Sequence, residues 1–93
     1  MYFVYILFSE KLNRYYVGTT DDVARRLFEH NSGFYDGVFT SKGIPWRLCL
    51  SYSCDTSDKA YALERFVKRM KSRKFIEKIL DDVKIIDDIV SKL

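Results

Sequence analysis

The stretch that decides the fold is residues 2–31, YFVYILFSEKLNRYYVGTTDDVARRLFEHN. Its first run, 2–8, is apolar throughout and rich in aromatic and β-branched residues, which predicts a strand buried on both faces. The polar segment 10–14 is short enough for a hairpin loop, and strand chemistry resumes at Tyr15. These features predict a β-hairpin whose first strand is central in its sheet.

A helix is predicted directly after the hairpin. Thr20 has the side chain of an N-cap, and Asp21 and Asp22 supply acidic residues for a first turn, so we expect the helix to begin there. Arg26 and His30 lie four residues apart, on one polar stripe of this helix. This histidine is the only one in the chain.

The rest of the chain predicts a third strand followed by helices. Residues 46–53 (WRLCLSYS) alternate apolar and polar side chains, which is typical of a strand with one apolar face. Residues 56–58 cap a helix, and residues 73–92 keep helical spacing, as one helix or as two. The core stripe of the first of these helices is expected to consist of Leu63, Phe66, Val67 and Met70. We therefore expect a small α/β fold of the α+β type, a three-stranded antiparallel sheet with helices packed against it.

Residues 32–45 contain three of the four glycines and the only proline, which predicts a long loop. Long loops in compact domains tend to be functional, so Lys42 is a candidate contact to a substrate. The alternative is a loop that merely covers the sheet.

Length and composition indicate one domain. The 93 residues are 47% hydrophobic, enough for a dense core but for no second domain, so we expect a single domain over 1–93 with an acidic helical extension at 81–93. No apolar run is long enough to span a membrane. Two cysteines and one histidine are too few for a disulfide framework or a structural zinc site. A reduced, cytoplasmic setting is expected.

The charge is unevenly distributed along a chain whose formal net charge is only +3. Within residues 65–80, Glu77 is the one acidic residue. The basic residues of this segment are Arg65, Lys68, Arg69, Lys71, Arg73, Lys74 and Lys78. Such a cluster is either a solvated helix face or an electrostatic track for phosphate.

The motifs of the first stretch resemble those of the GIY-YIG nuclease superfamily, in particular its small stand-alone branch. Val4-Tyr5-Ile6 and Tyr16-Val17-Gly18 stand in the places of the two name-giving motifs. Arg26 and His30 follow at the spacing of the family's helix, and Glu64 on a later helix completes the set. The resemblance covers roughly residues 2–80. Five positions in order at family spacing are more specific than any one of these motifs.

Two features depart from the family pattern. The first motif begins with Val4 where the family has glycine, and no asparagine follows Asn31, although some members carry a late asparagine near the active site.

A hairpin loop centred near 11–12 would place Tyr5 opposite Gly18, on the same face as Tyr16. We expect both tyrosine hydroxyls to open into one cleft with Arg26.

The resemblance implies an endonuclease that hydrolyses phosphodiester bonds with one Mg²⁺ or Mn²⁺ ion held by Glu64. DNA is the expected substrate, with repair or recombination as the expected process. Arg26 would bind the scissile phosphate, and Tyr5 or Tyr16 would accept the proton of the attacking water, with Tyr5 favoured. A phenol has an ordinary pKa near ~10, so it would need nearby positive charge or help from a base such as His30.

Other functions remain open from the sequence. Each candidate side chain, taken singly, has an ordinary structural role as an alternative. The first rival is a non-catalytic nucleic-acid-binding domain that keeps the nuclease fold, and the second is a protein-interaction module. A separate protein partner could supply targeting. The residues expected to contact nucleic acid are Lys42, Arg65, Lys68, Lys71, Arg73 and Lys74.

Overall fold

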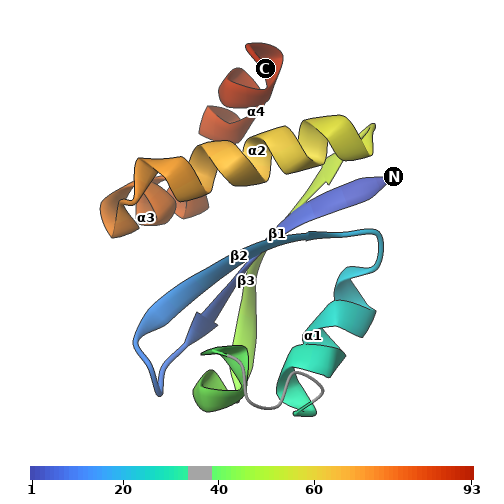
Figure 1. Cartoon of the computed structure of the whole chain (residues 1–93). Helices are drawn as coiled ribbons and strands as arrows, with labels where there is room; N and C mark the ends of the chain where they lie inside the picture. The colour runs from blue at the N-terminus through green and yellow to red at the C-terminus, as the bar shows by residue number, and fades with distance from the viewer. Residues whose placement is uncertain (34–38) are drawn as a thin grey trace.

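The computed structural model describes residues 1–33 and 39–93. Its elements are β1 (Tyr2–Ser9), β2 (Arg14–Thr20), α1 (Val23–Asn31), the 3₁₀ helix η1 (Phe39–Gly43), β3 (Trp46–Cys54), α2 (Ser57–Met70), α3 (Arg73–Asp81) and α4 (Lys84–Ser91). The strands form one antiparallel sheet in the order β2-β1-β3. Figure 1 shows α1 on one side of this sheet and α2, α3 and α4 on the other. The predicted α+β fold is confirmed. The middle of the predicted loop, 34–38, lies outside the described residues.

The first strand is the centre of the sheet, as predicted. β1 pairs with β2 along one edge and with β3 along the other. Its alternating side chains enter two different cores, because successive residues of a strand point to opposite faces. Val4 and Ile6 pack under α2, α3 and α4. Tyr5 and Leu7 pack with residues of α1 on the opposite face.

The predicted hairpin register is confirmed. Tyr5 pairs with Gly18, and Leu7 pairs with Tyr16, so the two motif tyrosines share the α1 face of the sheet. Gly18 is required by space rather than by backbone angle. A Cβ atom at this position would lie 2.5 Å from the Tyr5 hydroxyl oxygen, far inside contact distance.

The third strand differs from its prediction of one apolar face. Its register shifts opposite Ile6 and Leu7, where Cys49 is the extra residue of a β-bulge. An extra residue reverses the alternation, so Trp46 packs on the α1 face while Leu50 packs on the α2 face. Leu48, expected in the apolar face, is 39% exposed. Hydropathy alternation alone could not reveal this bulge.

The helices also differ from prediction in detail. α1 is capped by Asp22, whose side chain accepts a hydrogen bond from the Arg25 N–H, and not by Thr20. In α2 the side chain of Thr56 is the N-cap, as predicted. Met70, placed in the core stripe by its spacing, is 45% exposed, because it is the last residue of α2 and lies beyond the sheet contact. Residues 73–92, whose spacing fits one helix or two, form two helices.

Candidate active site

The hydroxyl of Tyr5 is buried against His30. Its oxygen lies 3.1 Å from His30 Nε2, and the two residues are 2% and 3% exposed. Burial lowers the pKa of the His30 imidazole, and the positive charge of Arg26 lowers it further, while Glu29 acts in the opposite direction. The ring is therefore neutral at pH 7, and in its Nδ1–H tautomer Nε2 accepts the Tyr5 hydroxyl hydrogen. The expectation that Tyr5 opens into a cleft is wrong, because α1 covers this hydroxyl.

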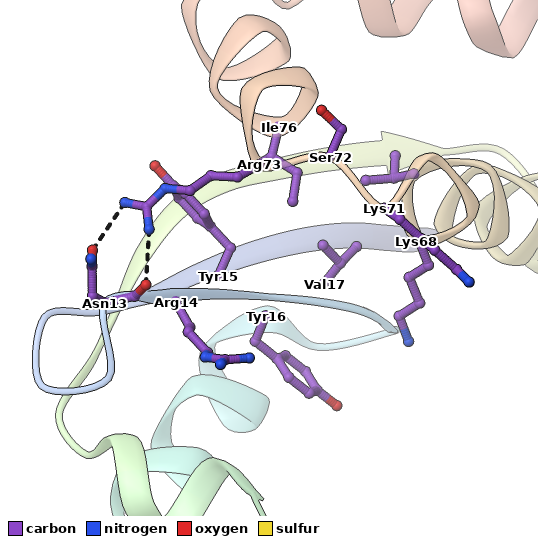
Figure 2. A pocket seen from close by; sticks show the side chains of 11 residues that line it. Asn13, Arg14, Tyr15, Tyr16, Val17, Lys68, Lys71, Ser72, Arg73 and Ile76 are labelled. Atoms are coloured by element: carbon purple, nitrogen blue, oxygen red, sulfur yellow. Dashed lines mark hydrogen bonds between the residues drawn. The ribbon is translucent and has the colours of Figure 1, made fainter.

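Tyr16 is the motif tyrosine that is partly exposed. Its ring lies edge-on to His30, at 4.9 Å between ring centroids, and also contacts Trp46 at 6.2 Å. The Tyr5 ring is a third neighbour at 6.2 Å. These contacts fix the Tyr16 ring, while its hydroxyl is directed away from β2 (Figure 2).

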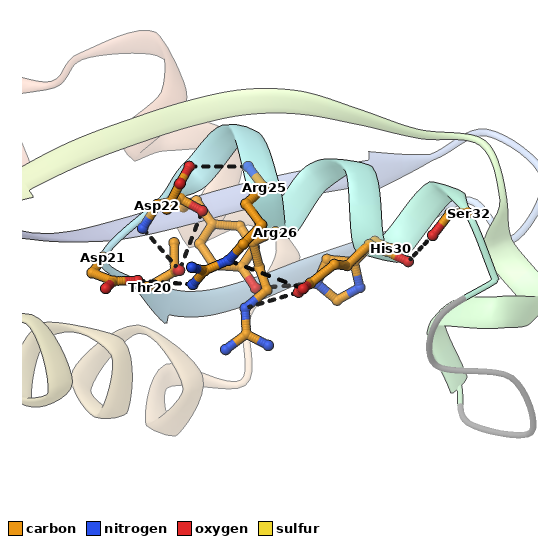
Figure 3. A network of polar contacts seen from close by, with 9 residues as sticks. Thr20, Asp21, Asp22, Arg25, Arg26, His30 and Ser32 are labelled. Atoms are coloured by element: carbon orange, nitrogen blue, oxygen red, sulfur yellow. Dashed lines mark hydrogen bonds and ion pairs between the residues drawn. The ribbon is translucent and has the colours of Figure 1, made fainter.

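Arg26 lies one turn before His30 on α1. Its Nε atom is 4.0 Å from a carboxylate oxygen of Glu29, and about a third of its side chain is exposed. Figure 3 shows Arg26 with the polar contacts along this helix, where neighbouring Arg25 pairs with Asp21 at 2.9 Å. Arg26 is thus held near the histidine while its guanidinium stays partly accessible.

Glu64, on α2, contacts β2 from the face of the sheet opposite to α1. Its Oε1 atom accepts a hydrogen bond of 2.5 Å from the Thr19 hydroxyl, and its Oε2 atom lies 2.6 Å from the ammonium of Lys68. Thr19 and Tyr16 are three positions apart on β2, so they point to opposite faces. The edge strand therefore carries the phenol on one face and anchors the carboxylate on the other. Among the described residues, no group of three or more His, Cys, Asp or Glu side chains could hold a metal ion.

A groove of about 640 Å³ runs beside β2. It is lined by Asn13, Arg14, Tyr15, Tyr16, Val17, Val67, Lys68, Lys71, Ser72, Arg73 and Ile76. The floor is apolar and aromatic, and the rim carries cations from β2, the end of α2 and the start of α3. Figure 2 shows the Lys68 side chain reaching down past β2 toward the side on which Tyr16 lies.

The structure divides the predicted nucleic-acid contacts into two groups. Three of them, Lys68, Lys71 and Arg73, line the groove, whereas Lys42, Arg65 and Lys74 do not. Arg14, which the sequence did not single out, also lines it. The end of α2 and the start of α3 place the groove cations together, and helical periodicity alone gives no indication of which basic residues face β2.

Arg73 has a structural engagement as well. Its guanidinium donates to the backbone oxygen and to the side-chain oxygen of Asn13, at 2.9 and 3.0 Å, and pairs with Glu77. It also stacks near the rings of Phe8 and Tyr15. Arg73 therefore ties the β1–β2 turn to α3. Lys42, at the end of η1, is exposed.

Thr19 is a candidate site residue that the sequence did not indicate. Its position, one residue before the expected helix cap, suggests no chemical role. Its importance arises from contact with Glu64, 45 positions later in the chain. Only the packing of α2 across β2 reveals that pairing, since no local pattern links the two residues.

The fold and this cluster define a small α+β domain with a polar site at the edge of its sheet. The chain belongs to the GIY-YIG family, because the model of the GIY-YIG catalytic domain matches residues 1–78. Membership gives the chain a nuclease-type function related to nucleic acid. Members are generally endonucleases and usually depend on divalent metal ions.

A solved structure supports the same assignment. The solution NMR structure of the UPF0213 protein BH0048 from Bacillus halodurans is 32% identical in sequence, with a TM-score of 0.55. The alignment covers 87% of this chain and 84% of that protein. No curated protein matches the chain. None of the helices in the described part has both the length and the apolar character needed to cross a bilayer.

Proposed function

We propose that this protein is a divalent-metal-dependent endonuclease that hydrolyses phosphodiester bonds, with DNA as its substrate. The observation that carries the proposal is that β2 supplies one candidate catalytic residue and also positions another. Its Tyr16 belongs to the cluster with His30, and its Thr19 orients Glu64. A phenol and a carboxylate from opposite faces of the sheet are thereby brought to one edge, beside a groove with a basic rim.

Tyr16 is the proposed partner of the attacking water. It is the partly exposed member of the tyrosine pair, whereas the Tyr5 hydroxyl is engaged with His30 in the interior. In this assignment Tyr5 and His30 fix the position of the Tyr16 ring. Once Tyr16 has lost its own proton to solvent, its oxygen takes a proton from the attacking water as that water adds to phosphorus. The bond to the leaving oxygen then breaks, and the leaving oxygen takes up a proton from solvent. Arg26 offers donors to the phosphate oxygens as negative charge accumulates.

Glu64 is the proposed ligand for one Mg²⁺ or Mn²⁺ ion. Its carboxylate is oriented by the Thr19 hydroxyl, and its other oxygen already accommodates a cation, the ammonium of Lys68. Hard divalent ions take oxygen ligands, and Mg²⁺ commonly keeps several waters beside one or two carboxylates. When bound, the ion would supply Lewis-acid stabilisation of the phosphate and of the leaving oxygen.

The groove beside β2 is the proposed track for the phosphate backbone. Arg14, Lys68 and Lys71 offer positive charge along it, and phosphate contacts of this kind are independent of sequence. Repair or recombination of DNA in the cytoplasm, with targeting supplied by a partner protein, remains our proposal for its cellular role. The alternative, a binding domain without catalysis, shares the groove and differs only in what happens after binding.

Single-turnover cleavage tests this function. The chain is incubated with branched, nicked and single-stranded DNA and with RNA, with and without Mg²⁺. Cleavage that requires the ion is expected, and Glu64→Gln should abolish it while keeping an acceptor for Thr19. Glu77→Gln is the matched control, since it also removes a carboxylate from a helical ion pair, with Arg73. Arg26→Ala should slow cleavage by about 10²–10³-fold, the usual loss for one transition-state donor.

Two results would contradict the proposal. If the chain binds these nucleic acids but cuts none of them, the non-catalytic binding domain is the better description. If Glu64→Gln cuts as fast as the unchanged chain, the ion is held elsewhere.

A further inference from the structure

The two oxygens of Glu64 have different partners. Oε1 is held by the Thr19 hydroxyl in a part-buried contact between α2 and β2, in which Thr19 is 8% exposed. Oε2 is held by Lys68, one turn further along the same helix. The first contact fixes the carboxylate on the sheet. The second is an exposed ion pair within one helix.

The Lys68 ion pair can be exchanged at little cost. About half of the Lys68 side chain is exposed, against 18% of the Glu64 side chain, and ion pairs of this spacing near a surface stabilise a helix only weakly. A lysine ammonium is a compact charge on a flexible four-carbon stem, so it can change partner without moving the backbone. Thr19 would continue to hold Glu64 after such a change.

Lys68 also lies where a second anionic partner could reach it. It lines the groove together with Tyr16 and Lys71, and its side chain lies beside the edge of β2 (Figure 2). A phosphate in that groove would attract its ammonium. Lys68 therefore stands between the carboxylate proposed to bind metal and the groove proposed to bind nucleic acid.

We propose that Lys68 occupies the cation position on Glu64 in the absence of nucleic acid, and leaves it for a backbone phosphate when nucleic acid binds. This inference rests on the proposed function and adds a coupling to it. A metal ion and the ammonium compete for one carboxylate oxygen, so the ion binds weakly while Lys68 is in place. Nucleic acid draws the ammonium away, and by linkage each ligand strengthens the binding of the other.

Calorimetric titration with Mn²⁺ tests this coupling without measuring cleavage. The full chain is titrated alone and with a phosphorothioate DNA oligonucleotide, which carries the charge of DNA and resists hydrolysis. For the unchanged chain, the oligonucleotide should raise the Mn²⁺ affinity at least about fivefold, the lower end of typical coupling between sites. Lys68→Gln should bind Mn²⁺ about fivefold more tightly in the absence of the oligonucleotide, and most of the coupling should disappear.

Lys71→Gln is the matched control. It removes the same charge from the same groove, but the ion pair of Glu64 is formed by Lys68 rather than by Lys71. Mn²⁺ affinity without the oligonucleotide should therefore rise much less than in Lys68→Gln, since salt screens a charge that is not in contact with the carboxylate. Thermal melts of both variants check that each is folded. If Lys68→Gln and Lys71→Gln change Mn²⁺ affinity by the same factor, the change comes from the loss of positive charge in the groove as a whole, and the proposed exchange of Lys68 is wrong.

Glu64→Gln separates this inference from the proposed function. If it binds Mn²⁺ as tightly as the unchanged chain, the metal site and the exchange are both wrong. If Mn²⁺ binding depends on Glu64 but Lys68→Gln behaves like the unchanged chain, the exchange alone is overturned and the proposed nuclease site stands.

Discussion

The two motif tyrosines look equivalent in the sequence but occupy different environments. Both lie on the α1 face of the sheet. Tyr5, on the central strand, is covered by His30, whereas Tyr16, on the edge strand, keeps part of its surface in solvent. Sheet position therefore separates a phenol that supports the site from one that can meet a substrate. Our sequence-based preference for Tyr5 as the base is replaced by a proposal for Tyr16.

Phenylalanine substitutions distinguish these roles. Tyr16→Phe keeps the ring against His30 and removes only the partly exposed hydroxyl, so single-turnover cleavage should fall by about 10²–10⁴-fold, the usual contribution of a general base, with little change in stability. Tyr5→Phe leaves the buried His30 nitrogen without this partner and should lower the free energy of unfolding by about 1–3 kcal/mol. Cleavage rates and urea unfolding of both variants supply the test. If Tyr5→Phe instead slowed cleavage and Tyr16→Phe left the cleavage rate unchanged, Tyr5 would be the general base.

His30 makes the stability of the fold dependent on pH. Its pKa is lowered in the folded state, so the unfolded chain binds more protons as the pH falls below the ordinary histidine value of about 6.5. Stability contributed by the neutral ring is fully present above that pH. It is lost as the pH falls toward the folded-state pKa, and it levels off below it. Urea unfolding between pH 8 and pH 5 should show this loss.

The matched variant is His30→Gln, which has no titrating ring. Since His30 is the only histidine in the chain, the variant should show a clearly shallower decline over this range. Equal declines in the two proteins would mean that other groups cause the effect.

At the scale of elements, local chemistry predicted most of what was observed. The apolar run of β1, the Thr56 cap and the hairpin register were all correctly predicted, because each depends on neighbouring residues. The bulge at Cys49 was missed, since one extra residue in a strand leaves no mark on composition. The pairing of Thr19 with Glu64 was missed because it depends on how α2 crosses β2. The candidate site was thus foreseen as a set of residues, but not as an arrangement.

The extension foreseen at 81–93 is packed into the domain. The helix of this region, α4, buries Ile86 in the core under the sheet. Its Asp87 accepts a hydrogen bond of 2.6 Å from the Tyr52 hydroxyl on β3, which raises the pKa of Tyr52 to about 12. Asp87 and Asp88 are therefore carried by α4 on the α2 side of the sheet, whereas Asp81 is the last residue of α3 and Asp82 lies between the two helices.

At the scale of the whole molecule, we expect DNA binding to depend on where the cations lie more than on the net charge. The double variant Lys68→Gln/Lys71→Gln removes two charges from the groove. It should weaken DNA binding with little dependence on sequence. On duplex DNA, the slope of log K against log salt concentration should flatten by about 0.9 for each phosphate that the variant no longer neutralises. Fluorescence anisotropy with labelled DNA over a series of salt concentrations measures both quantities.

The control for that experiment is Lys74→Gln/Lys78→Gln. It removes the same number of charges from α3, at positions that do not line the groove. Its salt dependence should stay close to that of the unchanged chain. Equal flattening by both double variants would mean that the whole basic surface, and not the groove, attracts DNA.

The basic rim of the groove has a further consequence for the molecule in solution. In the described sheet β2 has one strand neighbour, so its outer side carries backbone groups on which a strand of another molecule could add. Arg14, Lys68 and Lys71 line that side, and a second copy of the chain would bring the same cations toward them. Mutual repulsion would then oppose edge-to-edge association between copies, while the polyanion proposed as substrate is attracted. The charges that suit this edge to nucleic acid would also help to keep the protein from aggregating through it.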